Sequence, residues 1–187
     1  VGVDAVASIP EMTSVGGTRM STDAEGNWLS EQSWYDVALT QGTAGGASTL
    51  YGRPPWQDVN SNAGPADRRL VPDVSAVGDP FTGVKFVFRS QVLTGGGTSQ
   101  SAPIWAGFAA LINDMFAATG ADPLGDLNPL LYEVAKGSTA APGFRDVSLG
   151  GNAITPGGRP GYDMVTGLGS PNIENLAKNI LLARARR

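Results

Sequence analysis

Apolar side chains recur at helical spacing in three segments of the chain. In the first, Pro103 suits an opening turn and Gly120 the position that ends a helix; its apolar face is Ile104, Phe108, Leu111, Ile112 and Met115. The second runs from Asn128, which suits an N-cap, to the helix-stopping Gly137. The pattern predicts a helix in each of these two segments.

A third helix and several strands complete the predicted elements. The helix begins in the segment 170–176, with Ile173, Leu176, Ala177, Ile180 and Leu181 on one side. Segment 12–18, Met-Thr-Ser-Val-Gly-Gly-Thr, is typical of a buried strand that runs into a glycine turn. Alternating apolar residues at 84, 86 and 88 follow a Pro/Gly turn and predict a hairpin. Strands mixed with crossover-length helices favour an α/β layered fold with a largely parallel sheet flanked by helices.

The composition is that of one globular domain, residues 1–187, with many tight loops. The chain has 26 glycines and 13 prolines, and Trp28, Trp34 and Trp56 are spaced as anchors for long loops in segment 21–67. A net charge of −4 argues against nucleic acid, because a phosphate-binding surface needs clustered Lys and Arg. No apolar run approaches the roughly 18 residues of a membrane-spanning helix. We therefore expect neither nucleic acid nor a membrane as a partner.

Two absent residue types restrict the chemistry. The chain has no cysteine, which excludes disulfides, thiolate zinc sites and a cysteine nucleophile. It also has no histidine, the usual general base and the usual proton switch near neutral pH. A serine nucleophile would therefore need a carboxylate or a lysine as its base, and a carboxylate base favours acidic conditions.

The segment Thr-Gly-Gly-Gly-Thr-Ser-Gln-Ser-Ala-Pro, residues 94–103, carries the candidate nucleophile Ser99. A serine at the start of a helix lies near backbone N–H groups that stabilise developing negative charge, as acyl transfer requires. Glycines at 95–97 would let a substrate backbone approach. The same short motif also fits a turn with a capped helix, and both interpretations stay open on this motif alone.

A glycine-rich loop between Asp146 and Asp163 is a candidate calcium site. Calcium prefers six to eight oxygen ligands, commonly carboxylates with main-chain carbonyls, and this loop can supply both kinds. The alternative is that the two aspartates cap turns in a Gly/Pro loop, and their spacing favours neither interpretation.

Several blocks in the same order resemble the sedolisins, the serine-carboxyl peptidases that share the subtilisin fold. They are residues 8–18 (Ser-Ile-Pro-Glu-Met-Thr-Ser-Val-Gly-Gly-Thr), 52–57 (Gly-Arg-Pro-Pro-Trp-Gln), 71–83 (Val-Pro-Asp-Val-Ser-Ala and onward), 95–114 around the serine, 127–135 and 161–172. They cover nearly the whole chain. The resemblance implies a subtilisin-like three-layer fold, of which residues 1–187 are the C-terminal portion of a single peptidase domain.

The resemblance also implies roles for particular residues. It makes Ser99 the nucleophile and leaves Ser101 as a structural cap. The partner Glu and Asp and an oxyanion-hole Asp would come from sequence upstream of this chain. It makes one calcium ion the cofactor, bound by the side chains of Asp146 and Asp163 and the carbonyls of Val147, Arg159 and Gly161, although the family commonly has glycine at the Arg159 position.

Two acids within the chain are weaker candidates for a catalytic role. Asp73 precedes the serine between apolar residues, but its family counterpart is structural. Glu31, near Trp34, would either touch substrate or satisfy backbone donors.

The function implied by the resemblance is a serine endopeptidase or tripeptidyl peptidase that cleaves peptides or proteins at acidic pH. It implies an extracellular or acidic compartment, and as partner the upstream part of the same domain, on the same chain or processed from it. The chain alone would be inactive. Two alternatives remain open: part of a subtilisin-type Ser-His-Asp peptidase, and a calcium-stabilised domain without catalytic activity.

Overall fold

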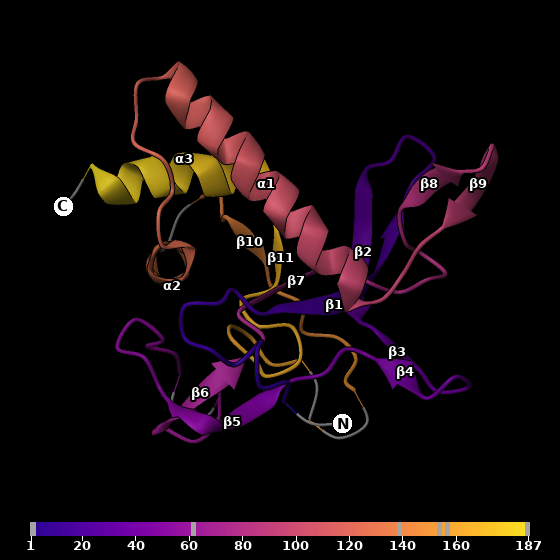
Figure 1. The fold of residues 1–187 in the computed structure, drawn as a ribbon, viewed down its shortest axis with the longest axis horizontal. Coiled ribbons are helices and arrows are strands. Elements are labelled where there is room, and N and C mark those ends of the chain that lie inside the picture. The colour runs from indigo at the N-terminus through magenta and orange to yellow at the C-terminus, as the bar shows by residue number, and fades with distance from the viewer. Residues whose placement is uncertain (1–2, 61–62, 138–139, 153–154, 156–157, 186–187) are drawn as a thin grey trace.

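The computed structural model describes residues 3–60, 63–137, 140–152, 155 and 158–185 (Figure 1). The helices are α1 (Thr98–Ala118), α2 (Leu127–Lys136) and α3 (Ile173–Arg184). The strands are β1 (Val15–Thr22), β2 (Trp28–Ser33), β3 (Tyr35–Asp36), β4 (Gln41–Gly42), β5 (Gly46–Gly52), β6 (Arg68–Val71), β7 (Val74–Val77), β8 (Lys85–Phe88), β9 (Gln91–Thr94), β10 (Phe144–Arg145) and β11 (Ser170–Pro171).

A three-stranded sheet, in the order β2-β1-β7, lies at the centre of the molecule. β1 pairs with β7 in parallel, Val15 opposite Val74, and with β2 antiparallel. The other sheets are two-stranded and antiparallel: β3–β4, β5–β6, β8–β9 and β10–β11. Within the described residues the sheet is therefore mixed, with one parallel pair, and the largely parallel sheet predicted from the sequence is not confirmed.

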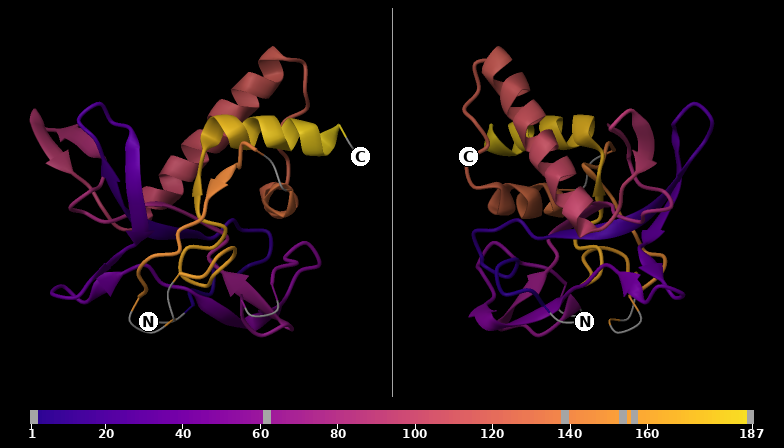
Figure 2. Two further views of the ribbon diagram at one scale, coloured as in Figure 1. Left: turned by 180° about the vertical axis from the view of Figure 1, so that it is seen from behind. Right: turned by 45° about the vertical axis from the view of Figure 1, so that its right-hand side comes forward.

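The three helices lie together on one side of the central sheet, while the β5–β6 hairpin and long loops occupy the other side (Figures 1 and 2). Between the helices and the sheet is a core formed by buried apolar residues, including Val74, Trp105, Phe116, Leu131, Leu176 and Ile180. A second, smaller apolar cluster joins Leu70 to Tyr132 and Tyr162. The predicted layers are thus present in part. Helices cover one face of the central sheet as predicted, but strands and loops of the described chain, rather than helices, cover the other face.

The two glycines of β1 lie within the strand, so the predicted glycine turn at the end of this segment is wrong. A Cβ on Gly17 would come within 2.9 Å of Trp34 Cε3. Glycine is needed here because the buried indole of Trp34 packs directly on the strand.

The predicted helices are confirmed, with changes at two of their ends. α1 begins at Thr98, five residues before Pro103, and Gly120 follows its end with a φ of +73°. α3 begins as expected, with the Asn172 side chain accepting a hydrogen bond from the Asn175 N–H. The N-cap of α2 is Asp126, and the prediction that Asn128 caps this helix is wrong.

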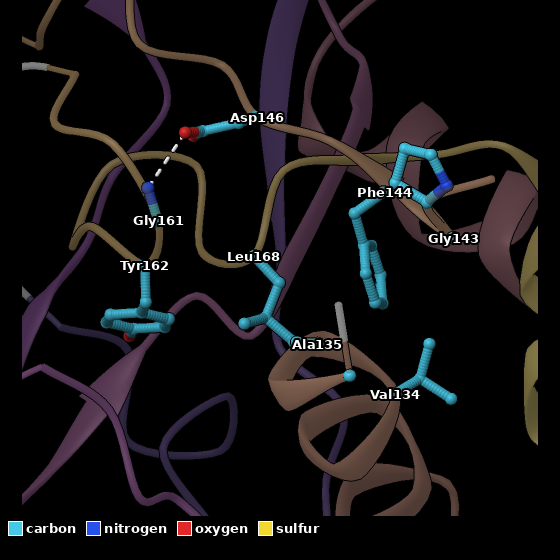
Figure 3. Close-up of a pocket in the computed structure, with 10 residues that line it drawn as sticks. Val134, Ala135, Gly143, Phe144, Asp146, Gly161, Tyr162 and Leu168 are labelled. Atoms are coloured by element: carbon cyan, nitrogen blue, oxygen red, sulfur yellow. Dashed lines mark hydrogen bonds between the residues drawn. The ribbon is translucent and has the colours of Figure 1, made fainter. Parts of the chain in front are cut away.

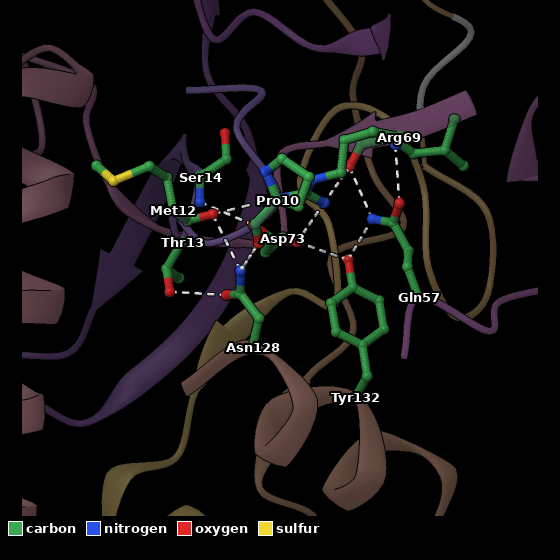
Figure 4. Close-up of polar contacts among 10 residues, drawn as sticks. Pro10, Met12, Thr13, Ser14, Gln57, Arg69, Asp73, Asn128 and Tyr132 are labelled. Carbon is green, nitrogen blue, oxygen red and sulfur yellow. Dashed lines mark hydrogen bonds and ion pairs between the residues drawn. The ribbon is translucent and has the colours of Figure 1, made fainter. Parts of the chain in front are cut away.

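Asn128 instead binds the N-terminal segment to α2. Its side-chain amide donates to the carbonyls of Pro10 and Met12, each at 3.0 Å, and its oxygen accepts from the Thr13 hydroxyl at 2.7 Å (Figure 4). The residue is fully buried. An amide with these long-range partners cannot also cap its own helix.

A buried ion pair between Arg69 and Asp73 joins several of these elements (Figure 4). Arg69 donates from both terminal nitrogens to the carboxylate, at 2.7 and 2.5 Å, and both side chains are completely inaccessible to solvent. The carboxylate also accepts from the Ser14 N–H and from the Tyr132 hydroxyl, each at 2.8 Å. Strands β6 and β7, the residues before β1, and α2 therefore meet at one carboxylate.

Gln57 extends this network toward the β5–β6 hairpin. Its amide nitrogen donates to the Leu70 carbonyl and the Tyr132 hydroxyl, and its oxygen accepts from the Leu70 N–H. Trp56, one of the predicted anchors, stacks near Tyr132 and lies 5.1 Å from the Arg69 guanidinium. Trp34 is buried as predicted, whereas Trp28 remains 41% exposed.

No helix in the described part of the chain is both long and apolar enough to cross a membrane.

We predict that Asp73→Asn lowers the free energy of unfolding by about 3–5 kcal/mol, because it leaves the buried guanidinium of Arg69 without a counter-charge. Urea unfolding followed by circular dichroism measures the loss. The matched control is Lys136→Met, which removes the exposed Lys136–Asp58 pair and should cost about 1 kcal/mol or less. Equal losses in the two variants would contradict the importance of the buried pair.

Candidate functional site

Ser99 is the second residue of α1, and its side chain is exposed. The N-cap residue is Gly97, two residues before Ser99. Its φ of +90° is a conformation that favours glycine and turns the chain into the helix. The Gln100 and Ser101 N–H groups both bond to the Gly97 carbonyl. The Thr98 and Ser99 N–H groups are thus the outermost donors of this helix end, where the dipole favours negative charge.

Two side chains of α1 fix the helix end against β7. The Ser101 hydroxyl lies 3.1 Å from the Ala76 and Val77 carbonyls, and the Trp105 indole N–H donates to the Ser75 carbonyl at 2.9 Å. Ser101 is fully buried. It therefore holds the helix to the sheet, and the prediction that it serves as a helix cap is wrong.

Packing and backbone conformation explain two of the three glycines before Ser99. A Cβ on Gly96 would come within 2.5 Å of Pro80 Cα, a backbone atom, and Gly97 has a positive φ. A Cβ on Gly95 would come within 2.5 Å of Gln100 Oε1, which is the end of a flexible side chain and can move away. The approach of a substrate backbone therefore stays a prediction for Gly95.

An open pocket of about 300 Å³ lies beside Ser99. Its walls are residues 97–99, Asn152, and the β3–β4 hairpin with Trp34 and Thr43. This volume is at the lower end of the range of small-molecule binding sites. Trp34 was expected only as a loop anchor, and Asn152 was missed because nothing near it in the sequence connects it to the serine.

No acid is among the described residues that line this pocket. Asp73 is committed to Arg69, Ser14 and Tyr132. Burial raises the pKa of Asp73, and the Arg69 guanidinium, the Ser14 N–H and the Tyr132 hydroxyl oppose that rise. These contacts give Asp73 a structural role, as the resemblance implied.

Glu31 is also buried and bound within the protein. Its carboxylate accepts from the Thr18 hydroxyl and the Ser170 hydroxyl, each at 2.5 Å, and from the Trp28 indole N–H at 3.2 Å. Side-chain donors, rather than the expected backbone donors, satisfy this acid. It joins β1, β2 and β11.

The five predicted calcium ligands all lie in the loop between β10 and β11. Asp146 Oδ2 accepts from the Gly161 N–H at 2.8 Å, and both residues line one pocket with Tyr162 (Figure 3). Asp163 and Arg159 line an adjacent pocket, which Tyr162 also borders. Val147 is buried, and its carbonyl accepts a hydrogen bond from the Thr166 hydroxyl at 3.3 Å.

Both aspartates of this loop have a raised pKa. Burial raises the pKa of Asp163; the charge of Asp146 adds a little, and the N–H groups of Thr166 and Val165 oppose the rise. Burial likewise raises the pKa of Asp146. Carboxylates and main-chain carbonyls are the oxygen donors that calcium prefers, but the two carboxylates border different pockets. Among the described residues there is no cluster of three metal-binding side chains, so any such site depends on carbonyls.

Comparison with known proteins identifies relatives along most of the chain. No family model matches. The chain is 36% identical over 179 residues to kumamolisin of Bacillus sp. (strain MN-32), covering 90% of this chain and 31% of that protein. It is 34% identical over 157 residues to tripeptidyl-peptidase 1 of Dictyostelium discoideum, covering 74% of this chain and 25% of that protein.

A solved structure agrees with these relatives. Pseudomonas sedolisin, a serine-carboxyl proteinase complexed with two molecules of pseudo-iodotyrostatin, matches 96% of this chain with a TM-score of 0.77 and 29% identity. The match covers 48% of the sedolisin chain, so this chain spans about half of that structure and a third or less of the curated relatives. Because sequence relatives and fold agree over nearly all of its length, the chain that carries Ser99 at the start of α1 belongs to the sedolisin family.

Proposed function

We propose that this chain is the C-terminal portion of the catalytic domain of a serine-carboxyl peptidase, with Ser99 as its nucleophile. The observation that carries the proposal is the position of Ser99, exposed at the N-terminus of α1 and bordering an open pocket. Its relatives include proteins named as tripeptidyl-peptidases and a serine-carboxyl proteinase. The substrates are peptides or proteins, cleaved as an endopeptidase or as a tripeptidyl peptidase.

In the proposed reaction the Ser99 hydroxyl attacks the scissile carbonyl carbon as its proton passes to a carboxylate. A tetrahedral oxyanion forms, the C–N bond breaks, and the amine leaves with a proton, giving an acyl-enzyme that water then hydrolyses. The N–H groups at the start of α1 would stabilise an oxyanion that develops next to Ser99. Donors fixed to a helix end held by Ser101 and Trp105 would need little reorganisation during the reaction.

The carboxylate that takes the proton comes from outside this chain. Asp73 and Glu31 are bound to structural partners, and the buried Asp79, which follows β7, pairs with Arg19. The described lining of the Ser99 pocket holds no acid. We infer that the partner Glu and Asp and an oxyanion-hole Asp belong to the part of a sedolisin-type domain that lies upstream. A carboxylate base implies activity at acidic pH, in an extracellular or acidic compartment.

One calcium ion would bind the side chains of Asp146 and Asp163 and the carbonyls of Val147, Arg159 and Gly161. When bound, the ion would supply charge neutralisation and cross-link the loop between β10 and β11, and it would take no part in bond cleavage. The support for this role is that both carboxylates lie in the loop between β10 and β11, in two pockets that Tyr162 borders, together with the loop carbonyls.

We predict that a fluorophosphonate labels Ser99 in the complete protein, with faster labelling at acidic than at neutral pH. The reason is that the proposed base is one carboxylate of a Glu/Asp pair. This base activates the Ser99 hydroxyl when the second carboxyl group of the pair is protonated, which requires acidic pH. Peptide mass spectrometry locates the modified residue. Ser99→Ala should abolish labelling, whereas Ser101→Ala in the same motif should retain it.

A folded, calcium-loaded protein in which Ser99 stays unlabelled would overturn the peptidase proposal and leave a domain without catalytic activity.

We predict that removing calcium with a chelator lowers the melting temperature by roughly 5–10 °C relative to calcium at a hundred times its Kd, because the ion binds only the folded state. Differential scanning calorimetry measures the shift. Asp163→Ala and Asp146→Ala should each abolish this response. The control is Asp126→Ala, which removes an exposed carboxylate and should leave the response to calcium unchanged.

No shift on chelation of the unmodified protein would reject the calcium site.

A further inference from the structure

The β8–β9 hairpin exposes large apolar side chains in the segment that leads into the nucleophile. Phe86, Val87, Phe88 and Val92 are between 46% and 73% exposed. Among the described strands, β8 and β9 pair only with each other. A two-stranded hairpin is marginally stable by itself, and an apolar patch of this kind commonly marks a binding surface.

The strand register divides the hairpin into two apolar faces. Phe86 lies opposite Leu93 and Val87 opposite Val92, and successive side chains point to alternate faces. The aromatic face therefore comprises Phe86, Phe88 and Leu93, and the valine face comprises Val87 and Val92. The two faces provide a matched comparison within one hairpin.

The aromatic face is continuous with the loop that carries Ser99. The place a Cβ would take on Gly95 lies 3.1 Å from Phe86 Cε1 and 2.5 Å from Gln100 Oε1. The Phe86 ring and the Gln100 side chain thus meet over Gly95, and Gln100 directly follows Ser99. The valine face has no such contact with this loop, since its residues point the other way.

The β8–β9 hairpin and the β3–β4 hairpin, which forms a wall of the Ser99 pocket, lie above and below the start of α1. In each view both project beyond this helix end, β8–β9 upward and β3–β4 downward (Figures 1 and 2). A peptide whose scissile bond lies at Ser99 and which enters the pocket would therefore reach the β8–β9 hairpin at its other end.

We propose that the aromatic face binds the substrate residues on the far side of the scissile bond from those in the Ser99 pocket, and that it selects large apolar side chains. This inference rests on the proposed peptidase function and adds a second region of substrate recognition. Burial of such side chains against Phe86 and Phe88 removes apolar surface of both partners from water.

The charge of the hairpin adds a preference at its tip. The charged residues of segment 85–94 are Lys85 and Arg89, both positive, and the Arg89 guanidinium lies 5.2 Å from the Phe88 ring centroid. The peptide that fits best therefore carries a carboxylate beyond its apolar residues, where it meets Arg89.

The test measures peptide binding in the complete protein carrying Ser99→Ala, which prevents turnover. The probe is a fluorescein-labelled peptide, Gly-Ala-Phe-Leu-Phe-Glu with a free carboxyl terminus, and fluorescence anisotropy gives its Kd. Phe86→Ser combined with Phe88→Ser should raise the Kd about tenfold or more, because two aromatic contacts are lost. The control, Val87→Ser combined with Val92→Ser, should change the Kd by about twofold or less.

A second pair of variants keeps the test valid if serine disorders the hairpin. Phe86→Leu combined with Phe88→Leu keeps the face apolar and should bind within about threefold of the parent protein. Arg89→Gln should weaken binding of this peptide and leave unaffected the binding of Gly-Ala-Phe-Leu-Phe-Gln amide, which carries no carboxylate. Equal weakening by the Phe→Ser and Val→Ser pairs, or no weakening by either, would overturn the proposal.

Two outcomes separate this inference from the proposed chemistry. Peptide binding that depends on the aromatic face in a protein whose Ser99 is never labelled would reject the peptidase and retain the binding surface. If Ser99 is labelled in the complete protein but the Phe→Ser pair binds the peptide with unchanged affinity, the aromatic face does not bind substrate and this inference is rejected. If that pair instead altered only the sedimentation of the protein, the face would be an interface between proteins and the proposal would fail.

Discussion

The position of the candidate nucleophile depends on the buried Arg69–Asp73 ion pair. Two charges without access to water must satisfy each other, so the segments that supply and surround them have little freedom. The same carboxylate holds the residue before β1 through the Ser14 N–H and holds α2 through Tyr132. Asp73 directly precedes β7, and the β7 carbonyls in turn hold Ser101 and Trp105 of α1. A chain of direct contacts thus leads from one ion pair to Ser101, two residues after Ser99.

Within the described residues, the candidate nucleophile Ser99 has no base beside it. The helix end that carries it is fixed, and the pocket beside it is open. Asp73 and Glu31, the two acids considered from the sequence, are both satisfied by internal donors. This arrangement agrees with a match that covers about half of the sedolisin chain, since an active site can be assembled from both halves of one domain.

The sequence predicts best those elements whose ends or faces depend on residues close together along the chain. The start of α3 was predictable because Asn172 caps its own helix, and the β8–β9 hairpin because its apolar residues alternate. The predicted start of α1 is too late, because Pro103 lies inside the helix although proline favours the first turn, and because the positive φ of Gly97 cannot be read from its sequence. The roles of Asn128 and Ser101 could not be predicted, because their partners lie far away along the chain. Of the predicted site residues, Ser99 and the five calcium ligands all remain predictions.

The bonds of Glu31 have a consequence for the order in which the chain can fold. This buried carboxylate in β2 takes one of its donors from Thr18 in β1 and another from Ser170 in β11. During synthesis, β1 and β2 emerge long before residue 170, so Glu31 lacks this donor until β11 has been made. Asn128 and its partners at residues 10–13 impose a similar delay. Contacts of such long sequence separation slow folding. The buried carboxylate beside the central sheet therefore gains its full set of donors only after β11 has been made.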